Sequence, residues 1–130
     1  MKLLLDTHVL VWFATNRRKL KRREREALVD PSATLLLSTI SLWELRAKTR
    51  AERRHGTRGL YLDPAGAIDF CIEADVAIEE MTLDDLLAAQ LIPEPPHGDP
   101  VDEMLLVHAR RLDAKLLTRD DKLLGHPLAY

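Results

Sequence analysis

The chain has 130 residues, of which 46% are hydrophobic and 31% are charged. This composition excludes an intrinsically disordered chain, and the length fits one domain covering residues 1–130. No segment approaches the roughly 20 consecutive apolar residues that a membrane-spanning helix needs. The sequence therefore predicts a single globular domain with no membrane span.

The net charge of −2 conceals a strong split along the chain. Residues 1–60 carry 14 Lys and Arg against 6 Asp and Glu, whereas residues 61–130 carry 5 against 15. A basic half can attract a polyanion, and an acidic half can hold cations. Charged helix faces exposed to solvent would produce the same split, so charge alone leaves both explanations open.

In chain order, short apolar runs alternate with longer segments of helical spacing. The sequence predicts a strand at Lys2–Leu5, a helix at Val9–Thr15, a basic loop at Arg17–Arg25 that enters a second helix, a strand at Leu35–Ser38, a helix at Ser41–Arg54, a loop at His55–Gly66, a helix at Ala67–Ala74, a strand at Val76–Glu79, and helices at Leu83–Leu91 and Pro100–Leu112 before a strand at Lys115–Thr118. This alternation favours an α/β fold with a mainly parallel sheet and helices on both faces.

The single cysteine and the start of the chain bear on where the protein works. Cys71 cannot form an internal disulfide, and its apolar neighbours predict a buried, inert thiol. Asp6 ends the apolar run Leu3–Leu5 long before a signal-peptide core could form. We therefore expect a cytoplasmic protein.

Four acids lie at the boundaries of predicted elements. Asp6 directly follows the first predicted strand, and Asp120 follows the last one in the segment KLLTRD. Glu44 and Asp102 lie in the first turns of two predicted helices. Ligands of open α/β sheets bind beyond the carboxyl ends of the strands, where these acids are expected.

Each acid also has a structural explanation. Glu44 matches a capping box with Ser41, and Asp99 before Pro100 matches an N-cap. Asp102 would then complement the dipole of the same helix. The two acids that follow strands could cap the helices beyond them, including a short final helix after the last strand.

Two of the acids fit these structural roles less well. Asp6 interrupts a run that is otherwise mainly apolar. Asp102 shares a helical stripe with Leu105, Leu106 and Ala109, so its side chain is expected on the core side. A buried carboxylate is costly unless it is paired or bound to a metal.

Grouped carboxylates without a cysteine or histidine ligand set suit a hard divalent cation such as Mg²⁺ or Mn²⁺. Such ions activate water and neutralise the oxygens of an in-line phosphoryl displacement. Like charges gathered in one place also predict that some of the carboxyl pKa values are raised. The acids therefore indicate metal-assisted hydrolysis of a phosphate ester.

Three segments, LLLDTHVLVW, SLWEL and HGDPVDEMLLVHARRLDAKLLTRDDKL, resemble the PIN-domain family in order and spacing, from Lys2 to Leu124. The likeness is greatest to the VapC-like toxin branch. It implies a three-layer α/β/α sandwich that cleaves RNA with Mg²⁺ or Mn²⁺. For VapC-like members it also implies a homodimer, inhibition by a small cognate antitoxin, and structured RNA targets such as transfer RNA.

The resemblance carries site residues over one by one. The catalytic and metal-binding acids fall on Asp6, Glu44, Asp102 and Asp120, which would hold the ions directly or through water. The likeness places Thr118 beside that site and Asp99 as an accessory acid near its mouth. The third motif departs from the family where Gly98 and Glu103 replace frequent arginines and Val101 replaces a frequent phenylalanine. These departures leave the choice of substrate open.

Basic and aromatic residues supply further candidates. We predict RNA contacts in two basic clusters, although solvated surface is the alternative; the candidates are Arg17, Arg18, Lys21, Arg22, Arg46 and Arg50. Trp12, Phe13 and Trp43 are expected in the core or a dimer interface rather than as base-stacking platforms. His8 could touch the site but receives no catalytic role.

The sequence favours a metal-dependent endoribonuclease, the toxin of a toxin–antitoxin pair, over two alternatives. One alternative is a metal-dependent phosphatase on a similar fold. Its aspartyl-phosphate version usually shows D-x-D after the first strand, and His8 occupies the third position here. The other is a catalytically silent module that binds nucleic acid or protein, in which the acids serve as helix caps.

Overall fold

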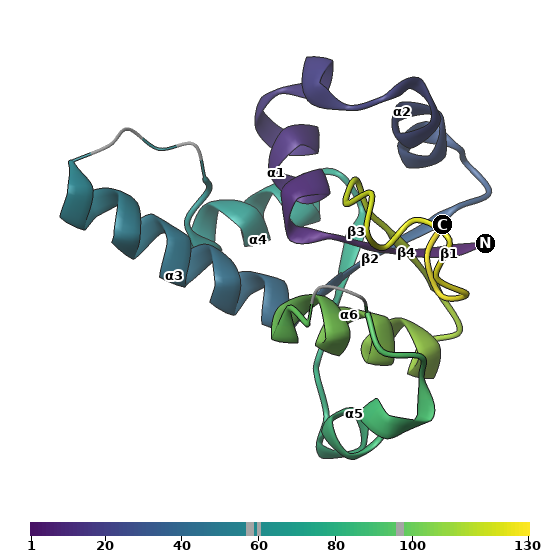
Figure 1. The fold of residues 1–130 in the computed structure, drawn as a ribbon. Coiled ribbons are helices and arrows are strands. Elements are labelled where there is room, and N and C mark those ends of the chain that lie inside the picture. Colours follow the sequence, from purple (N-terminus) through teal and green to yellow (C-terminus); the bar gives the residue numbers. More distant parts are fainter. Residues whose placement is uncertain (57–58, 60, 96–97) are drawn as a thin grey trace.

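A computed structural model describes residues 1–56, 59, 61–95 and 98–130. At its centre is a parallel sheet with strand order β3-β2-β1-β4 (Figure 1). The strands are β1 (Lys2–Leu5), β2 (Thr34–Ser38), β3 (Val76–Glu79) and β4 (Lys115–Leu117). The four predicted strands are confirmed, and β1 lies in the interior of the sheet.

Helices fill the connections between the strands, as the alternating pattern predicts. In the described chain they are α1 (Thr7–Thr15), α2 (Arg22–Val29), α3 (Thr39–His55), α4 (Pro64–Glu73), α5 (Leu83–Leu87) and α6 (Pro100–Arg111). Two short 3₁₀ turns, η1 (Arg17–Lys19) and η2 (Ala89–Leu91), complete the assignment. The basic segment after α1 is thus η1 followed by the start of α2.

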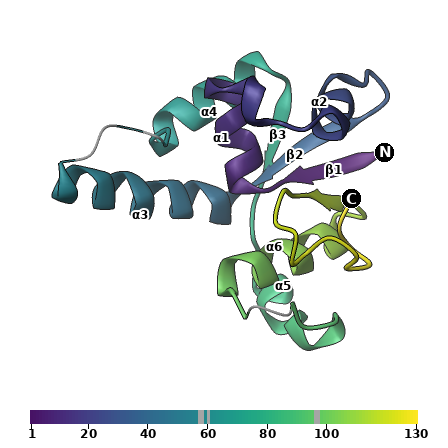
Figure 2. The same ribbon diagram turned by 45° about the horizontal axis from the view of Figure 1, so that its top comes forward.

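The sheet is buried on both faces, which makes the fold a three-layer α/β/α sandwich. Leu3, Leu4 and Leu5 are all fully buried, because successive side chains of a strand point to opposite faces. Leu3 and Leu5 pack in a core with residues of α1, α2, α3 and α4. Leu4 packs with Leu36 and residues of α6 in a second core. Figure 2 shows α1 and α4 on one side of the strands and α5 and α6 on the other.

The chain reverses its path across the sheet between β1 and β4. From β1 it steps to β2 and then β3, and it returns through α5 and α6 to place β4 on the other side of β1. Right-handed crossovers in opposite directions put their helices on opposite faces. The carboxyl ends of β1 and β4 therefore form the topological switch point, where such folds bind ligands.

Helix α3 begins earlier than the sequence indicated. Buried Ser38 is its N-cap and accepts a hydrogen bond from the Ile40 amide at 3.1 Å, so the helix starts at Thr39. Glu44 consequently lies in the second turn. Its predicted capping box with Ser41 is wrong, because Ser41 is already inside the helix.

Several other boundaries also differ from prediction, among them the start of α1 at Thr7 rather than Val9. Asp63 caps α4 by accepting a bond from the Gly66 amide at 2.8 Å, so the helix starts at Pro64 and the predicted loop His55–Gly66 is too long. Residues 57, 58 and 60 of that loop lie outside the described residues. The predicted helix Leu83–Leu91 divides into α5 and η2, and β4 ends one residue before Thr118.

Two predictions about burial and membranes can be compared with the structure. Cys71 is a buried free thiol, as predicted, and its burial raises the pKa of the thiol to about 11. No helix of the described residues has the length and hydropathy of a transmembrane segment.

Candidate active site

The acids singled out in the sequence line one cavity of about 410 Å³ beyond the carboxyl ends of β1 and β4; they are Asp6, Glu44, Asp99, Asp102 and Asp120. They arrive from the ends of two strands and from two helices that are distant in the sequence. His8, Trp12, Lys48 and Arg119 line the same cavity. Tertiary folding therefore gathers carboxylates around a space that also contains cationic side chains.

Asp6 is the most buried of these acids, with only 7% of its surface exposed. It follows β1 at the N-cap position of α1, but its side chain makes no capping bond there. Burial raises the pKa of the Asp6 carboxyl, and the nearby charge of Glu44 acts in the same direction. A raised pKa is what carboxylate clustering predicts, although desolvation contributes most of it.

Thr118 links the first acid to the last one. Its buried hydroxyl donates to Oδ2 of Asp6 at 2.8 Å and accepts from the Asp120 amide at 3.0 Å. Because this hydroxyl uses both its donor and an acceptor position, it holds the ends of β1 and β4 in one arrangement. Thr118 thus lies beside Asp6, where the family resemblance places it.

Two buried hydrogen bonds orient helix α3, which carries Glu44. The Thr7 hydroxyl in α1 donates to the Ser41 hydroxyl at 3.0 Å. Ser38, at the start of the helix, bonds Nδ1 of His108 in α6 at 2.8 Å. The start of α3 is therefore bonded to α1, which follows Asp6, and to α6, which carries Asp102. These bonds fix the position of the helix that carries Glu44.

Helix α6 brings two acids to the cavity in different roles. Asp99 is its N-cap and accepts bonds from the amides of Val101 and Asp102 at 2.9 and 3.3 Å. The predicted capping role of Asp99 is confirmed, and its side chain also lines the cavity. Asp102 is half-buried in the first turn, with buried Leu105 and Leu106 one turn further along.

Asp120 lies in a turn rather than at the start of a final helix. Its side chain accepts a bond from the Lys122 amide at 2.9 Å, which is an Asx-type turn. The residues that follow form turns and an isolated bridge between Leu116 and Ala129. The predicted short final helix is wrong, and the side chain of Asp120 faces the cavity instead.

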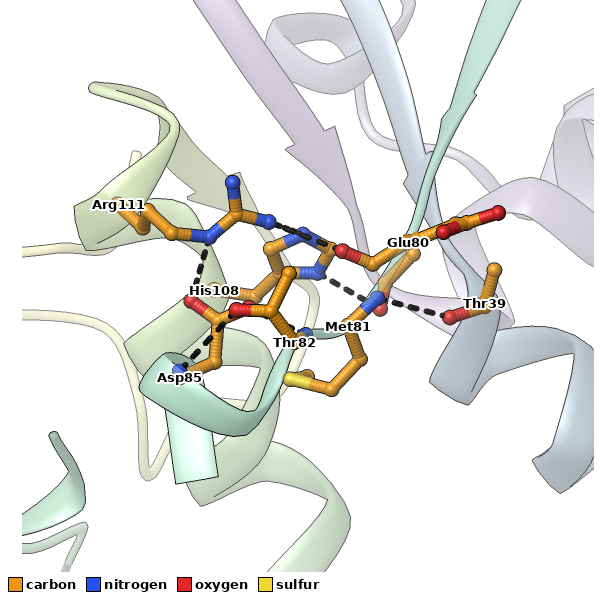
Figure 3. A network of polar contacts seen from close by, with 8 residues as sticks. Thr39, Glu80, Met81, Thr82, Asp85, His108 and Arg111 are labelled. Atoms are coloured by element: carbon orange, nitrogen blue, oxygen red, sulfur yellow. Dashed lines mark hydrogen bonds and ion pairs between the residues drawn. The ribbon is translucent and has the colours of Figure 1, made fainter. Parts of the chain in front are cut away.

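A polar network centred on Arg111 joins α6 to α5 and to the end of β3 (Figure 3). Arg111 donates to Oδ1 of Asp85 at 2.7 Å, to the Glu80 carbonyl at 2.9 Å and to Nε2 of His108 at 3.0 Å. Because arginine only donates, His108 must accept at Nε2 and carry its proton on Nδ1, facing Ser38. His108 is fully buried, and its pKa is lowered mainly by that burial.

Asp85 is the buried carboxylate of this network. Burial opposes its charged form, but bonds from Arg111 and Thr82 outweigh that effect and lower the pKa of Asp85. The network connects α5, α6 and the end of β3 with the N-cap of α3. It therefore fixes the position of the helix that carries Asp102.

Arg119 is a cavity residue that sequence reasoning missed. Its guanidinium bonds both carboxylate oxygens of Glu24, at 2.7 and 2.8 Å, and also donates to the Lys19 carbonyl. It lies 4.8 Å from the ring centroid of Trp12. The sequence signal that could have identified Arg119 as a cavity residue is its position directly before Asp120. Burial opposes ionisation of Glu24, but the bonds from Arg119 and the Lys21 amide prevail and lower the pKa of Glu24.

The aromatic residues have three different environments. Phe13 is buried in the core as predicted. Trp12 is half-buried and lines the cavity, a role the sequence analysis did not assign. Trp43 is 66% exposed on α3, so its predicted place in the core is wrong, and the dimer-interface alternative stays a prediction.

The predicted RNA-binding cations lie outside the carboxylate cavity. All six are exposed; they are Arg17, Arg18, Lys21, Arg22, Arg46 and Arg50. Lys21 and Arg22 form ion pairs with Asp121 and Glu26 at 4.0 and 2.7 Å. Lys48 and Arg119 are the lysine and arginine that line the cavity among the described residues.

Carboxylate oxygens are the ligands that Mg²⁺ and Mn²⁺ prefer, and Asp6 supplies a physical reason for a cation at this cavity. This carboxylate is buried, its pKa is raised, and no lysine or arginine of the described residues pairs with it. A bound cation would offset the cost of its charge. Within the described ranges, no three Asp, Glu, His or Cys side chains are grouped closely enough to hold an ion. The expectation of ligands acting directly or through water therefore stays a prediction.

The comparison with protein families identifies the class of this chain. The family model of the PIN domain matches residues 3–125, nearly the whole sequence. The chain belongs to the PIN-domain family. No curated protein sequence matches it.

Solved structures of VapC toxins and their complexes share its fold. VapBC2 from Rickettsia felis, bound to a promoter DNA fragment, is 16% identical with a TM-score of 0.67, covering 99% of this chain and 96% of that chain. VapBC-1 from nontypeable Haemophilus influenzae is 20% identical with a TM-score of 0.59, covering 96% and 91%. VapC20 from Mycobacterium tuberculosis, a sarcin-ricin loop cleaving toxin, is 17% identical with a TM-score of 0.60, covering 95% of each chain.

Proposed function

We propose that this PIN-domain protein is a metal-dependent endoribonuclease and the toxin of a toxin–antitoxin pair. The observation that carries the proposal is the common cavity lined by Asp6, Glu44, Asp102 and Asp120. Capping accounts for Asp99, but Glu44 lies in the second turn of its helix and Asp6 makes no side-chain capping bond. Metal-assisted hydrolysis gives these carboxylates a common role.

The comparisons support the biological part of the proposal. The structural neighbours are VapBC complexes and a VapC toxin that cleaves the sarcin-ricin loop. By analogy with them, we expect a cognate antitoxin as partner and a structured RNA, such as transfer RNA, as substrate. We also expect a homodimer, and a cytoplasmic location where both partners are available.

Four acids would hold the cation, directly or through water; they are Asp6, Glu44, Asp102 and Asp120. A bound Mg²⁺ or Mn²⁺ would activate the attacking water and neutralise charge on the phosphate oxygens. Thr118 keeps the Asp6 carboxylate oriented, which fits a residue that supports metal ligands from outside. Lys48 and Arg119 place positive charge at the same cavity, where a phosphate group would approach.

The exposed basic clusters would attract the rest of the RNA. The candidates Arg17, Arg18, Arg46 and Arg50 lie on η1 and α3 rather than in the cavity. Contacts with phosphates at such positions would add affinity without sequence information, and salt would weaken them. We therefore expect cleavage to decline steeply with ionic strength.

The test is cleavage of a pool of structured RNAs by the purified full chain. Wild type should cleave with Mn²⁺ or Mg²⁺ and stop with EDTA, whereas folded Asp6→Asn should be inactive. Asp69→Asn is the matched control, because Asp69 is an exposed acid of α4 outside the cavity.

Other outcomes of this test would contradict the proposal. Equal cleavage by wild type and Asp6→Asn would show that the activity does not arise at this cavity. RNA binding that is insensitive to chelator, without turnover, would indicate a non-catalytic binding module. Hydrolysis of small phosphate esters alone would indicate a phosphatase.

A further inference from the structure

A second cavity adjoins the carboxylate cavity and shares two of its walls. It has a volume of about 340 Å³ and is lined by residues that include His8, Trp12, Asn16, Lys19 and Tyr61. His8 and Trp12 line both cavities. The volume lies within the roughly 300–1,000 Å³ of typical small-ligand pockets. A ligand that spans the two spaces would have one part beside the carboxylates and another among aromatic rings.

Three rings stand in sequence along this second cavity, which we call the aromatic cavity. The His8 ring centroid is 5.8 Å from that of Trp12 and 5.8 Å from that of Tyr61, with interplanar angles of 47° and 68°. Nε2 of His8 lies 3.3 Å from the Tyr61 hydroxyl. Tyr61 therefore fixes the imidazole between the two larger rings. All three side chains are half-buried, so each keeps part of its surface open to a ligand.

Cations flank this row of rings. The Arg119 guanidinium lies over Trp12 at 4.8 Å, and the Lys48 ammonium lies 5.3 Å from the Tyr61 centroid. Lys19, exposed at the end of η1, lines the aromatic cavity itself. Aromatic faces beside positive charge are the two features that single-stranded nucleic acid requires, one for its bases and one for its backbone.

We propose that the aromatic cavity holds a nucleobase of the RNA substrate next to the phosphodiester that is cut. This inference rests on the proposed ribonuclease function and adds a specificity subsite to it. The base would stack on Trp12 with its phosphate directed past His8 toward the carboxylates. Sequence-selective RNA binding commonly uses unpaired bases stacked on aromatic side chains, so the subsite selects a looped-out or single-stranded nucleotide.

Asn16 is the side chain that would discriminate between bases. It lies just after α1 at the aromatic cavity, is exposed, and offers both an amide donor and a carbonyl acceptor. Stacking accepts any base, whereas paired hydrogen bonds to a base edge do not. Trp12 should therefore govern affinity, and Asn16 should govern which base is preferred.

Trp12 fluorescence tests the subsite without removing it. The chain contains two tryptophans, so Trp43→Phe leaves Trp12 as the only one. This variant, also carrying Asp6→Asn and kept in EDTA, is titrated with hexamers of adenylate, cytidylate or uridylate. Saturable quenching of Trp12 is expected with the hexamers but not with an abasic hexamer of equal charge. Equal responses to both oligonucleotides, or RNA binding that leaves Trp12 emission unchanged, would overturn the proposal.

Binding variants give the second readout. Trp12→Ala should weaken hexamer binding by about 5- to 150-fold, the range expected for loss of one base–aromatic stack. Trp12→Phe retains a stacking face and should lose less, which controls for packing damage. Trp43→Ala is the matched control, because this exposed tryptophan lines neither cavity. Equal weakening by Trp43→Ala and Trp12→Ala would overturn the assignment.

Asn16→Ala separates recognition from affinity and from catalysis. It should weaken binding of the preferred hexamer and leave the affinities of the other two nearly unchanged, so the difference among the three hexamers narrows; an unchanged order and spacing of affinities would contradict its role. Binding is measured without metal and without Asp6, so a failure of the ribonuclease proposal leaves these readouts intact. Conversely, cleavage that depends on Asp6 but not on Trp12 would refute only the subsite.

Discussion

Two buried carboxylates, Asp6 and Asp85, lie in different regions of this molecule and behave in opposite ways. Asp85, in the network behind α6, is 2% exposed and pairs with Arg111 at 2.7 Å, and its pKa is lowered. Asp6, at the end of β1, is 7% exposed, has a hydroxyl rather than a cation as its hydrogen-bond partner, and has a raised pKa. Burial opposes ionisation at both positions, so the partner decides the direction.

This difference separates structural acids from an acid that fits a reactive site. A carboxylate neutralised by arginine already has its counter-charge and holds elements of the fold together. A buried carboxylate without one makes the folded chain less stable unless a ligand supplies that charge. Glu24 repeats the structural pattern, since Arg119 bonds both of its oxygens.

The largest effect should come from removing the charge of Asp6. Asp6→Asn keeps an acceptor for Thr118 but should lower metal-dependent cleavage by more than the ~10–100-fold typical of residues that only support metal ligands. Without metal, its thermal unfolding temperature should equal or exceed that of wild type, because a desolvated charge is gone. Calorimetry in EDTA and RNA cleavage in Mn²⁺ measure the two effects. A clear loss of stability would make Asp6 a structural acid like Asp85.

Replacing Arg111 should have the opposite effect to Asp6→Asn: it should lower stability more than it lowers cleavage. Arg111→Met keeps the aliphatic stem but leaves the Asp85 side chain, 1% exposed, without its cation. Breaking a fully buried ion pair from one side typically costs about 3–5 kcal/mol of stability, and because the Arg111 side chain is 39% exposed we expect a smaller loss here. Urea unfolding monitored by circular dichroism measures this loss, and cleavage by the folded protein at low temperature should fall much less than in Asp6→Asn, because Arg111 supports α6 from outside the cavity. An unfolding free energy close to that of wild type would contradict the network's structural role.

Variants of Thr118 test whether the role of Asp6 depends on the hydroxyl group that bonds it. Thr118→Val removes the bonds to Asp6 and to the Asp120 amide with little change in shape, and should reduce metal affinity or cleavage by ~10–100-fold. Thr118→Ser restores the hydroxyl and should recover most of the activity. Isothermal titration calorimetry with Mn²⁺ measures the metal affinity of each variant. Equal behaviour of the valine and serine variants would show that the hydroxyl is dispensable.

The smallest expected effect is the pH dependence of stability, which should differ in sign between Asp6 and Asp85. The raised pKa of Asp6 means a penalty that is fully present above that pKa and is relieved as pH falls through it toward 3.8. In EDTA, wild type should therefore gain stability relative to Asp6→Asn on acidification. Asp85 contributes stability above pH 3.8, which is lost as pH falls through its lowered pKa. Denaturant midpoints from pH 7 to 3 would show these opposite trends, and parallel curves for wild type and Asp6→Asn would contradict them.

Local pattern was sufficient for the strands and for placing acids directly after two of them. Lys2–Leu5 and Val76–Glu79 were predicted with the bounds that the structure has, because short apolar runs favour buried strands. Once such strands pair in parallel, an acid directly after one of them lies at the carboxyl edge of the sheet. The order of the motifs also indicated the PIN-domain family, which the family match confirms.

Tertiary contacts decided what each polar residue does. Ser38 starts α3 because it is buried against His108, and this moves Glu44 into the second turn. Arg119 comes to the cavity through its pairing with Glu24, a residue 95 positions earlier in the chain. Neither partner is visible in a local sequence pattern, since hydrogen bonds and desolvation depend on which distant segments meet. Sequence alone therefore determined where acids stand along the chain, and only the fold decided which acid has a cation beside it.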